Sequence, residues 1–110
     1  MLILIWASDV VLDLQGHTLG RGRLLKNPGG NGIEIVDKYT NIRILNGTLQ
    51  DFHTGVFHDS AKYPAVEEVP TYDAQLNTYR FPKSGVVLEN ITFKNNKENF
   101  RIRIPREQKP

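Results

Sequence analysis

Three segments of the chain repeat one apolar pattern, and this repeat constrains the fold more than any other feature. Each reads apolar, any residue, apolar, three positions compatible with a turn, threonine and apolar; the segments are Leu12–Leu19, Ile42–Leu49 and Val86–Phe93. Apolar residues that alternate with a period of two indicate strands with one buried face. A shorter apolar motif recurs in phase with them, at Ile3–Ile5, Ile33–Ile35, Val56–His58 and Phe100–Ile102.

The spacing of the shorter motif sets the size of the repeating unit. Ile33 and Val56 are 23 residues apart, and the other two intervals, of 30 and 44 residues, contain insertions at about 20–31 and 59–83. Strands at equivalent positions would stack about 4.8 Å apart. We therefore predict an all-β fold, a parallel β-helix (solenoid) of about three to four coils. It forms a single domain over residues 1–110, with a basic tail at 104–110. A β-sandwich is the alternative, since regular short strands also build that fold.

The repeat also predicts which residues stack on one another. The expected interior stacks are Leu12, Ile42 and Val86; Leu14, Ile44 and Leu88; and Leu19, Leu49 and Phe93. The expected outward rows are Leu4, Glu34, Phe57 and Arg101, and beside them Trp6, Val36, Asp59 and Arg103. Asn46 above Asn90 predicts a ladder of side-chain amides. Both asparagines also match the glycosylation acceptor pattern, but the repeat by itself explains an asparagine and a threonine there.

The composition excludes several classes of function. A chain of 110 residues with 39% hydrophobic and 24% charged residues is typical of a folded soluble protein. A net charge of +2 is too small to indicate nucleic acid or an anionic membrane as the partner. With no cysteine, the chain has no disulfide, no thiolate metal site and no cysteine nucleophile. The apolar start, Met1–Trp6, is too short to span a membrane and lacks the basic region of a signal peptide.

The segments Asp9–Leu19, Gly32–Ile35 and Asn41–Leu49 resemble the pectin-lyase-like superfamily of right-handed parallel β-helices. The resemblance covers nearly the whole chain outside the two insertions. It implies the right-handed fold and, by analogy, a role like that of pectate lyases, polysaccharide epimerases or tailspikes, with acidic polysaccharide as the partner. It also favours an extracellular or cell-surface location. No cofactor is evident in the sequence, and Ca²⁺ is implied by the family alone, since no clustered set of aspartates matches a calcium site.

Candidate catalytic residues follow from the chemistry of acidic sugars. A uronate carboxylate has to be neutralised before the neighbouring C5 proton can be removed. Arg101 and Arg103 are the candidates for that neutralisation, with His58 or His53 as proton shuttle. Aromatic faces and nearby acids bind sugars, and the candidate substrate-binding residues are Asp59, Tyr63, Tyr72 and Tyr79. The histidines fit no metal-site spacing, so no metal ligands are predicted.

Two hypotheses about function remain open. The first is a carbohydrate-active or carbohydrate-binding protein; β-elimination or epimerisation is then favoured over hydrolysis, because no pair of carboxylates stands out. The second is a non-catalytic structural or assembly module, like a tailspike or adhesin, in which the alternating charges only keep the strands soluble. An uncovered end of the helix would expose apolar surface and open strand edges. We therefore expect self-association through the exposed ends or through the long loop.

Overall fold

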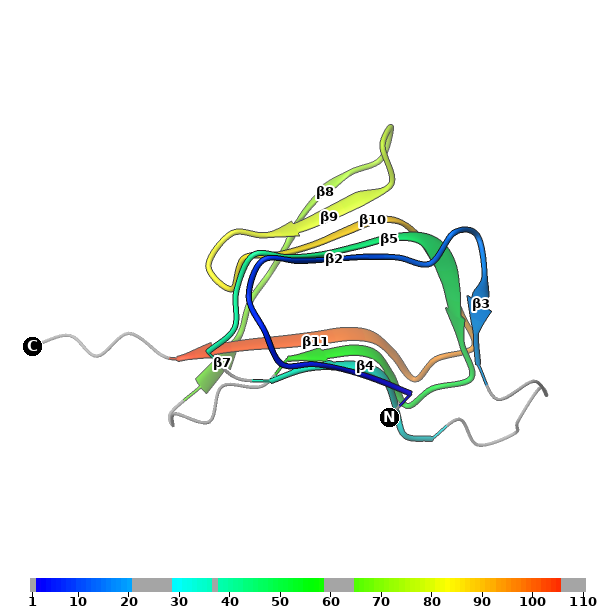
Figure 1. Cartoon of the computed structure of the whole chain (residues 1–110), viewed down its shortest axis with the longest axis horizontal. Helices are drawn as coiled ribbons and strands as arrows, with labels where there is room; N and C mark the ends of the chain where they lie inside the picture. The colour runs from blue at the N-terminus through cyan, green and yellow to red at the C-terminus, as the bar shows by residue number, and fades with distance from the viewer. Residues whose placement is uncertain (1, 21–28, 37, 59–64, 106–110) are drawn as a thin grey trace, which may run out of the picture.

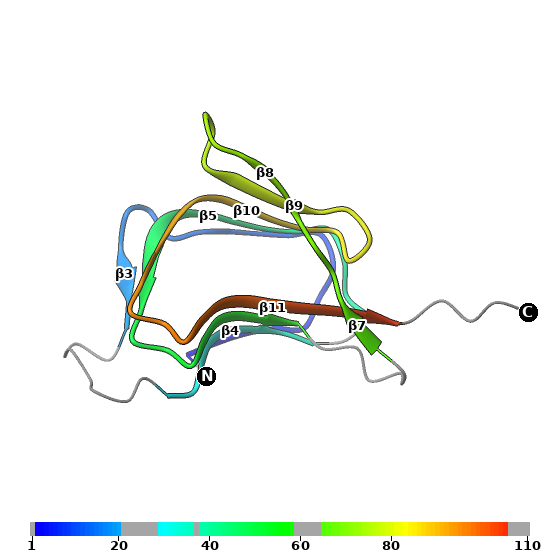
Figure 2. The same cartoon turned by 180° about the vertical axis from the view of Figure 1, so that it is seen from behind.

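The computed structural model describes residues 2–20, 29–36, 38–58 and 65–105, and these residues form strands and turns without any helix. Two sheets face one another across a single apolar core (Figures 1 and 2). The strands are β1 (Ile3–Ile5), β2 (Val10–Asp13), β3 (Thr18–Leu19), β4 (Asn31–Ile35), β5 (Ile42–Gln50), β6 (Thr54–His58), β7 (Ala65–Glu67), β8 (Thr71–Asp73), β9 (Thr78–Phe81), β10 (Val86–Lys94) and β11 (Glu98–Pro105).

The chain passes from one sheet to the other and back as it advances. One sheet has the strand order β1-β4-β6-β11-β7, and the other has the order β2-β5-β10-β9-β8, with β3 also pairing with β5. The pairs among β1, β4, β6 and β11 are parallel, as are the pairs of β5 with β2, β3 and β10. The pairs β11–β7, β10–β9 and β9–β8 are antiparallel.

The predicted right-handed parallel β-helix of about three to four coils is wrong, because both sheets are mixed. The prediction assigned residues 59–83 to a loop insertion outside the repeat. Within that range Ala65–Glu67, Thr71–Asp73 and Thr78–Phe81 form strands, which extend both sheets in the antiparallel direction. Their β-branched and aromatic residues favour strands independently of the repeat. The result is a compact two-sheet all-β fold and not a solenoid.

The register between the parallel strands follows the predicted repeat closely. Ile3, Ile33, Val56 and Phe100 are neighbours in turn, and so are Leu19, Leu49 and Phe93. The expected row of Leu4, Glu34, Phe57 and Arg101 is confirmed as well.

One part of the predicted register is displaced by two residues. Ile42 pairs with Val10 instead of Leu12, and Ile44 pairs with Leu12 instead of Leu14. The bend between β2 and β3 contains two additional residues, Gln15 and Gly16, which have φ values of 52° and 80°. These left-handed conformations turn the chain sharply, and Leu14 folds inward at the bend and is buried.

The core consists of the inward-facing residues of both sheets. From one sheet come Ile5, Ile33, Ile35, Val56 and Ile102, and from the other come Ile42, Ile44, Leu49, Val86, Leu88 and Ile91. Phe52 and Phe81 fill the spaces beside them and are almost completely buried. The side chains of Ile3, Val10, Leu12 and Leu19, which lie toward the β1/β2 end, are only partly buried against this core.

Hydrogen-bonded side chains stack at the bends, as the repeat predicted for Asn46 and Asn90. The Asn90 amide nitrogen donates to Asn46 Oδ1 at 3.1 Å, and the Asn46 amide nitrogen donates to Asp13 Oδ1 at 3.3 Å. Asn46 and Asn90 have φ values of 57° and 53°, a left-handed conformation that asparagine tolerates better than most residues. Both amides therefore form hydrogen bonds that stabilise the bend. This role agrees with a structural origin of the Asn-x-Thr pattern.

Gly55 lies where two neighbouring strands approach each other too closely for a side chain. A Cβ atom at Gly55 would be 2.5 Å from the backbone oxygen of Asn99 and 3.2 Å from the ring of Phe93. A backbone oxygen cannot move aside without disturbing the β6–β11 pairing. Gly16, by contrast, has open space around it and requires only a left-handed backbone.

We predict that Gly55→Ala lowers the free energy of unfolding by about 1–3 kcal/mol, the usual cost of overpacking. The matched control is Gly16→Asn, which should change that free energy by less than about 0.5 kcal/mol because asparagine tolerates the left-handed conformation. Urea unfolding followed by circular dichroism measures both. Equal stability of Gly55→Ala and the unchanged chain would contradict the close approach.

Candidate functional site

Arg101 faces outward from β11, and its guanidinium group forms ion pairs with acidic neighbours. Its Nε atom lies 3.2 Å from Glu67 Oε1, close enough for an ion pair although the contact does not have hydrogen-bond geometry. One terminal nitrogen lies 3.9 Å from Glu98 Oε1. Glu67 comes from β7, which pairs antiparallel with β11 and brings this carboxylate to the arginine. A sugar carboxylate would have to displace these acids.

The two candidate histidines lie in different environments. The ring of His53 is half exposed at the start of β6, with Nδ1 at 3.1 Å from Thr54 Oγ1 and 4.0 Å from Glu98 Oε1. It therefore belongs to the same surface cluster as Arg101, through the shared neighbour Glu98.

His58 points the other way, into the core, and is only 5% exposed. Its neighbours in the sheet are Ile35 on β4 and Ile102 on β11, both of which are buried. Neither ring nitrogen has a hydrogen-bond partner in the part of the chain that the structure describes. The structure thus separates His58 from the outward arginines, and the predicted catalytic set does not meet at one place.

Arg103, Asp59 and Tyr63 were also predicted for the site, and the structure describes only the first of them. Arg103 lies opposite Glu67 in the β11–β7 pairing and also makes an interaction of its own. Asp59 and Tyr63 lie outside the described residues, so the predicted row of Asp59 beside Arg103 stays a prediction.

Tyr79 is mainly a packing residue of an aromatic cluster between the two sheets. Its ring centroid is 5.0 Å from that of Phe100 and 6.4 Å from that of Phe93. Phe81 packs edge-on against Phe100 with centroids 5.2 Å apart. Through these rings the β8–β9 hairpin covers the end of the core beyond β10 and β11.

Tyr72 lies on top of this cluster and is the part of it that solvent can reach. Its ring is 4.4 Å from that of Tyr79, measured between centroids, and its hydroxyl donates to Asn77 Oδ1 at 3.1 Å. Half of the residue remains exposed. One ring face is thus held in place by Tyr79, and the residue keeps a solvent-accessible apolar surface.

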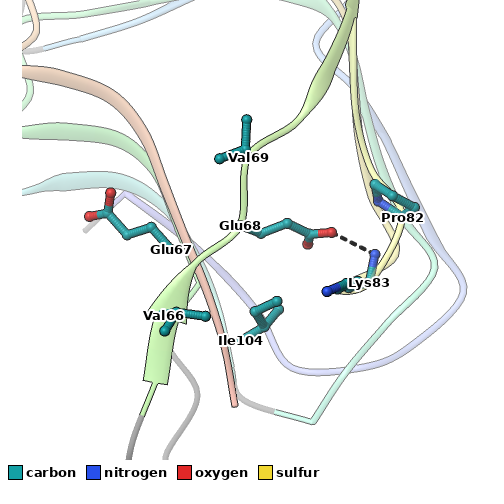
Figure 3. Close-up of a pocket in the computed structure, with 7 residues that line it drawn as sticks. All are labelled: Val66, Glu67, Glu68, Val69, Pro82, Lys83 and Ile104. Atoms are coloured by element: carbon teal, nitrogen blue, oxygen red, sulfur yellow. Dashed lines mark hydrogen bonds between the residues drawn. The ribbon is translucent and has the colours of Figure 1, made fainter. Parts of the chain in front are cut away.

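A cleft of about 330 Å³ lies beside β7, between that strand and the β9–β10 turn (Figure 3). Its lining combines aliphatic with charged side chains: Val66, Glu67, Glu68, Val69, Pro82, Lys83 and Ile104. The Glu68 carboxylate is buried and accepts the backbone N–H of Lys83 at 2.6 Å and that of Ser84 at 2.9 Å. Both of its oxygens are therefore engaged in joining β7 to the turn, and we assign this carboxylate a structural role.

The opposite end of the molecule presents a different surface, formed by β1 and β2. These strands are terminal in their sheets, so each has one edge without a partner strand among the described residues. Leu2, Leu4, Trp6 and Val11 are exposed there, with Trp6 72% accessible. The sequence predicted that Leu4 and Trp6 face outward, and both are exposed on this surface. We call it the open end and define it by the residues of β1 and β2 with Leu2 and Trp6.

Neither a metal site nor a membrane-spanning helix can be assigned in the described part of the chain. Residues 2–20, 29–36, 38–58 and 65–105 contain no group of three or more histidines and acids that could hold a metal ion. The same residues include no helix long and apolar enough to cross a membrane.

We predict that His58→Leu raises the free energy of unfolding by about 1–3 kcal/mol, because it removes two buried nitrogens that lack hydrogen bonds. The control is His53→Leu at the half-exposed surface position, which should change stability by less than about 0.5 kcal/mol. Thermal and urea unfolding both report the difference. A loss of stability in His58→Leu would show that the imidazole has a partner and would overturn this interpretation.

Comparisons with family models, with curated proteins and with solved structures gave no match to this chain. The resemblance to the pectin-lyase-like superfamily therefore stays a prediction. Any function has to be argued from the surfaces described above.

Proposed function

We propose that this chain is a non-catalytic assembly module that joins further sheet edges through its open end. The observation that carries the proposal is a pair of strand edges, β1 in one sheet and β2 in the other, that have no partner strand among the described residues and are flanked by exposed apolar side chains. A free strand edge is a template for pairing with another chain. Lysine and proline on an edge strand oppose such pairing, and β1 has neither in Ile3–Ile5.

At the other end of the molecule, the chain covers part of the core with its own residues. The β8–β9 hairpin packs aromatic rings over the core there. The segment from β7 to β8 crosses from one sheet to the other (Figure 2), and Glu68 in this segment is hydrogen bonded to Lys83 and Ser84. β7 and β8 are also terminal in their sheets among the described residues, so what distinguishes the β1/β2 end is the group of core residues that it leaves partly buried.

Catalysis on acidic polysaccharide has less support. Arg101, one of the two cations expected to bind the sugar carboxylate, is paired with Glu67 and Glu98. Of the two expected proton shuttles, His53 lies near Arg101 through Glu98, whereas His58 faces the core. An assembly role requires none of these residues to meet.

We predict that the chain associates in a concentration-dependent way and that Leu4→Lys suppresses the association, since it places a charge on the apolar surface of β1. The control is the same substitution, Leu76→Lys, at an exposed leucine in the turn of the β8–β9 hairpin. Sedimentation velocity over a wide concentration range measures both. A chain that stays monomeric throughout, or a Leu76→Lys variant that is the one to lose association, would overturn the proposal.

A second candidate function is carbohydrate binding at Tyr72. A half-exposed aromatic ring that its neighbours hold in place is a surface on which the apolar face of a sugar can stack. This candidate keeps the acidic polysaccharide expected from the sequence as ligand, without requiring catalysis.

For this candidate we expect Tyr72→Ala to reduce binding of pectate, alginate or a glycosaminoglycan at least tenfold. Val11→Ala, at the far end of the molecule, should leave binding unchanged. Isothermal titration with and without Ca²⁺ measures binding, and absorbance of unsaturated uronate ends reports any lysis. Binding that is equal in Tyr72→Ala and the unchanged chain, or absent in all three proteins, would remove the candidate.

A further inference from the structure

The short connection between β1 and β2 places their residues at matching heights in the two sheets. Four residues, Trp6 to Asp9, join Ile5 to Val10, so that the chain returns at once in the opposite direction (Figure 1). Counting away from this connection along both strands matches Ile5 with Val10 and Leu4 with Val11 in height. Ile3 lies at the height of Leu12 by the same count.

This arrangement fits a two-fold axis that runs parallel to the strands. Rotation about such an axis exchanges the two sheets and keeps the height of every residue. The β1 edge of one copy then lies beside the β2 edge of a second copy, and the same contact repeats on the other side, as two-fold symmetry requires. Because β1 and β2 run in opposite directions, the new pairs are antiparallel, a pairing that is at least as stable as the parallel one.

The side chains on both faces agree with this pairing. On the outer face, Leu4 meets Val11 of the second copy, and both are exposed in the single chain. On the inner face, Ile3 meets Leu12 and Ile5 meets Val10 of the second copy. Ile3, Val10 and Leu12 are the core residues left partly buried at the open end, and the contact would complete their burial.

Charge disfavours one register of the alternative arrangement, in which the two-fold axis is perpendicular to the sheets. Such an axis would pair β2 with itself, and a register centred on Val11 would set Asp9 opposite Asp13, with like charges facing each other. In the β1–β2 arrangement the same heights set Asp9 near Trp6 and Asp13 near Leu2. Neither of these neighbours carries a charged side chain.

We propose that the partner at the open end is a second copy of this chain, bound in a closed dimer by reciprocal antiparallel pairing of β1 with β2. The inference rests on the assembly function proposed above. One partner occupies both strand edges of the open end, so this contact closes at two copies.

The chain has no cysteine, which makes cross-linking at single introduced cysteines selective. Residues directly opposite each other in an antiparallel pair have Cα atoms about 4.5–5.5 Å apart, within the range that a disulfide bridges. We expect a mixture of full-length Leu4→Cys and Val11→Cys to form a mixed disulfide dimer on oxidation. Each variant alone should cross-link at least tenfold less, at the level of the control Leu76→Cys. Non-reducing electrophoresis and mass spectrometry of the linked peptides identify the products.

The alternatives give different products. Efficient cross-linking of Leu4→Cys or Val11→Cys alone would show that each strand pairs with itself and would overturn the reciprocal pairing. Sedimentation of species larger than dimers would overturn the closed dimer and leave the assembly function in place. A monomer at every concentration, without mixed disulfide, would remove the assembly function as well.

Discussion

The parallel pairing of β5 with β2 on one side and β10 on the other is the interaction on which the rest of the structure depends. These pairs place Val10, Ile42 and Val86 side by side, followed by Leu12, Ile44 and Leu88. Because neighbouring strands present apolar residues at the same heights, one sheet face is continuously apolar and can bury against the other sheet. The bends, the side-chain ladder from Asp13 through Asn46 to Asn90, and the close contact at Gly55 all follow from strands held at that spacing.

The parallel register could be predicted because stacked parallel strands repeat one apolar pattern in the sequence. Other parts of the fold have no such repeat. A slip of two residues keeps each side chain on its face, so apolar alternation alone could not detect the two additional residues at Gln15 and Gly16. The antiparallel strands β7, β8 and β9 do not share the repeat, so a constant period predicts an insertion in their place. Their tyrosines and valines were a strand signal that the period concealed.

The candidate site shows a similar division. The outward position of Arg101 follows from alternation, but its partner Glu67 comes from β7, a strand whose pairing was not predicted. His58 occupies the place of Ile35 in the shorter apolar motif, so the repeat itself indicated an inward position. Its chemistry suggested catalysis while its place in the pattern indicated the core, and the pattern was the better guide. For a histidine in a strand, the position in the inward and outward alternation should therefore be considered before its chemistry.

The ladder at the bends has a consequence for the chemical ageing of the protein. In an Asn-Gly sequence such as Asn46-Gly47, the glycine nitrogen can attack the side-chain carbonyl carbon of asparagine and release ammonia, and water then opens the cyclic imide to aspartate or isoaspartate. Here Asn46 is held through both ends of its amide, as donor to Asp13 and as acceptor from Asn90. A carboxylate in its place would lose the donor and face the carboxylate of Asp13. The hydrogen bonds that shape the bend therefore require the intact amide, and deamidation of Asn46 would break the ladder at its centre.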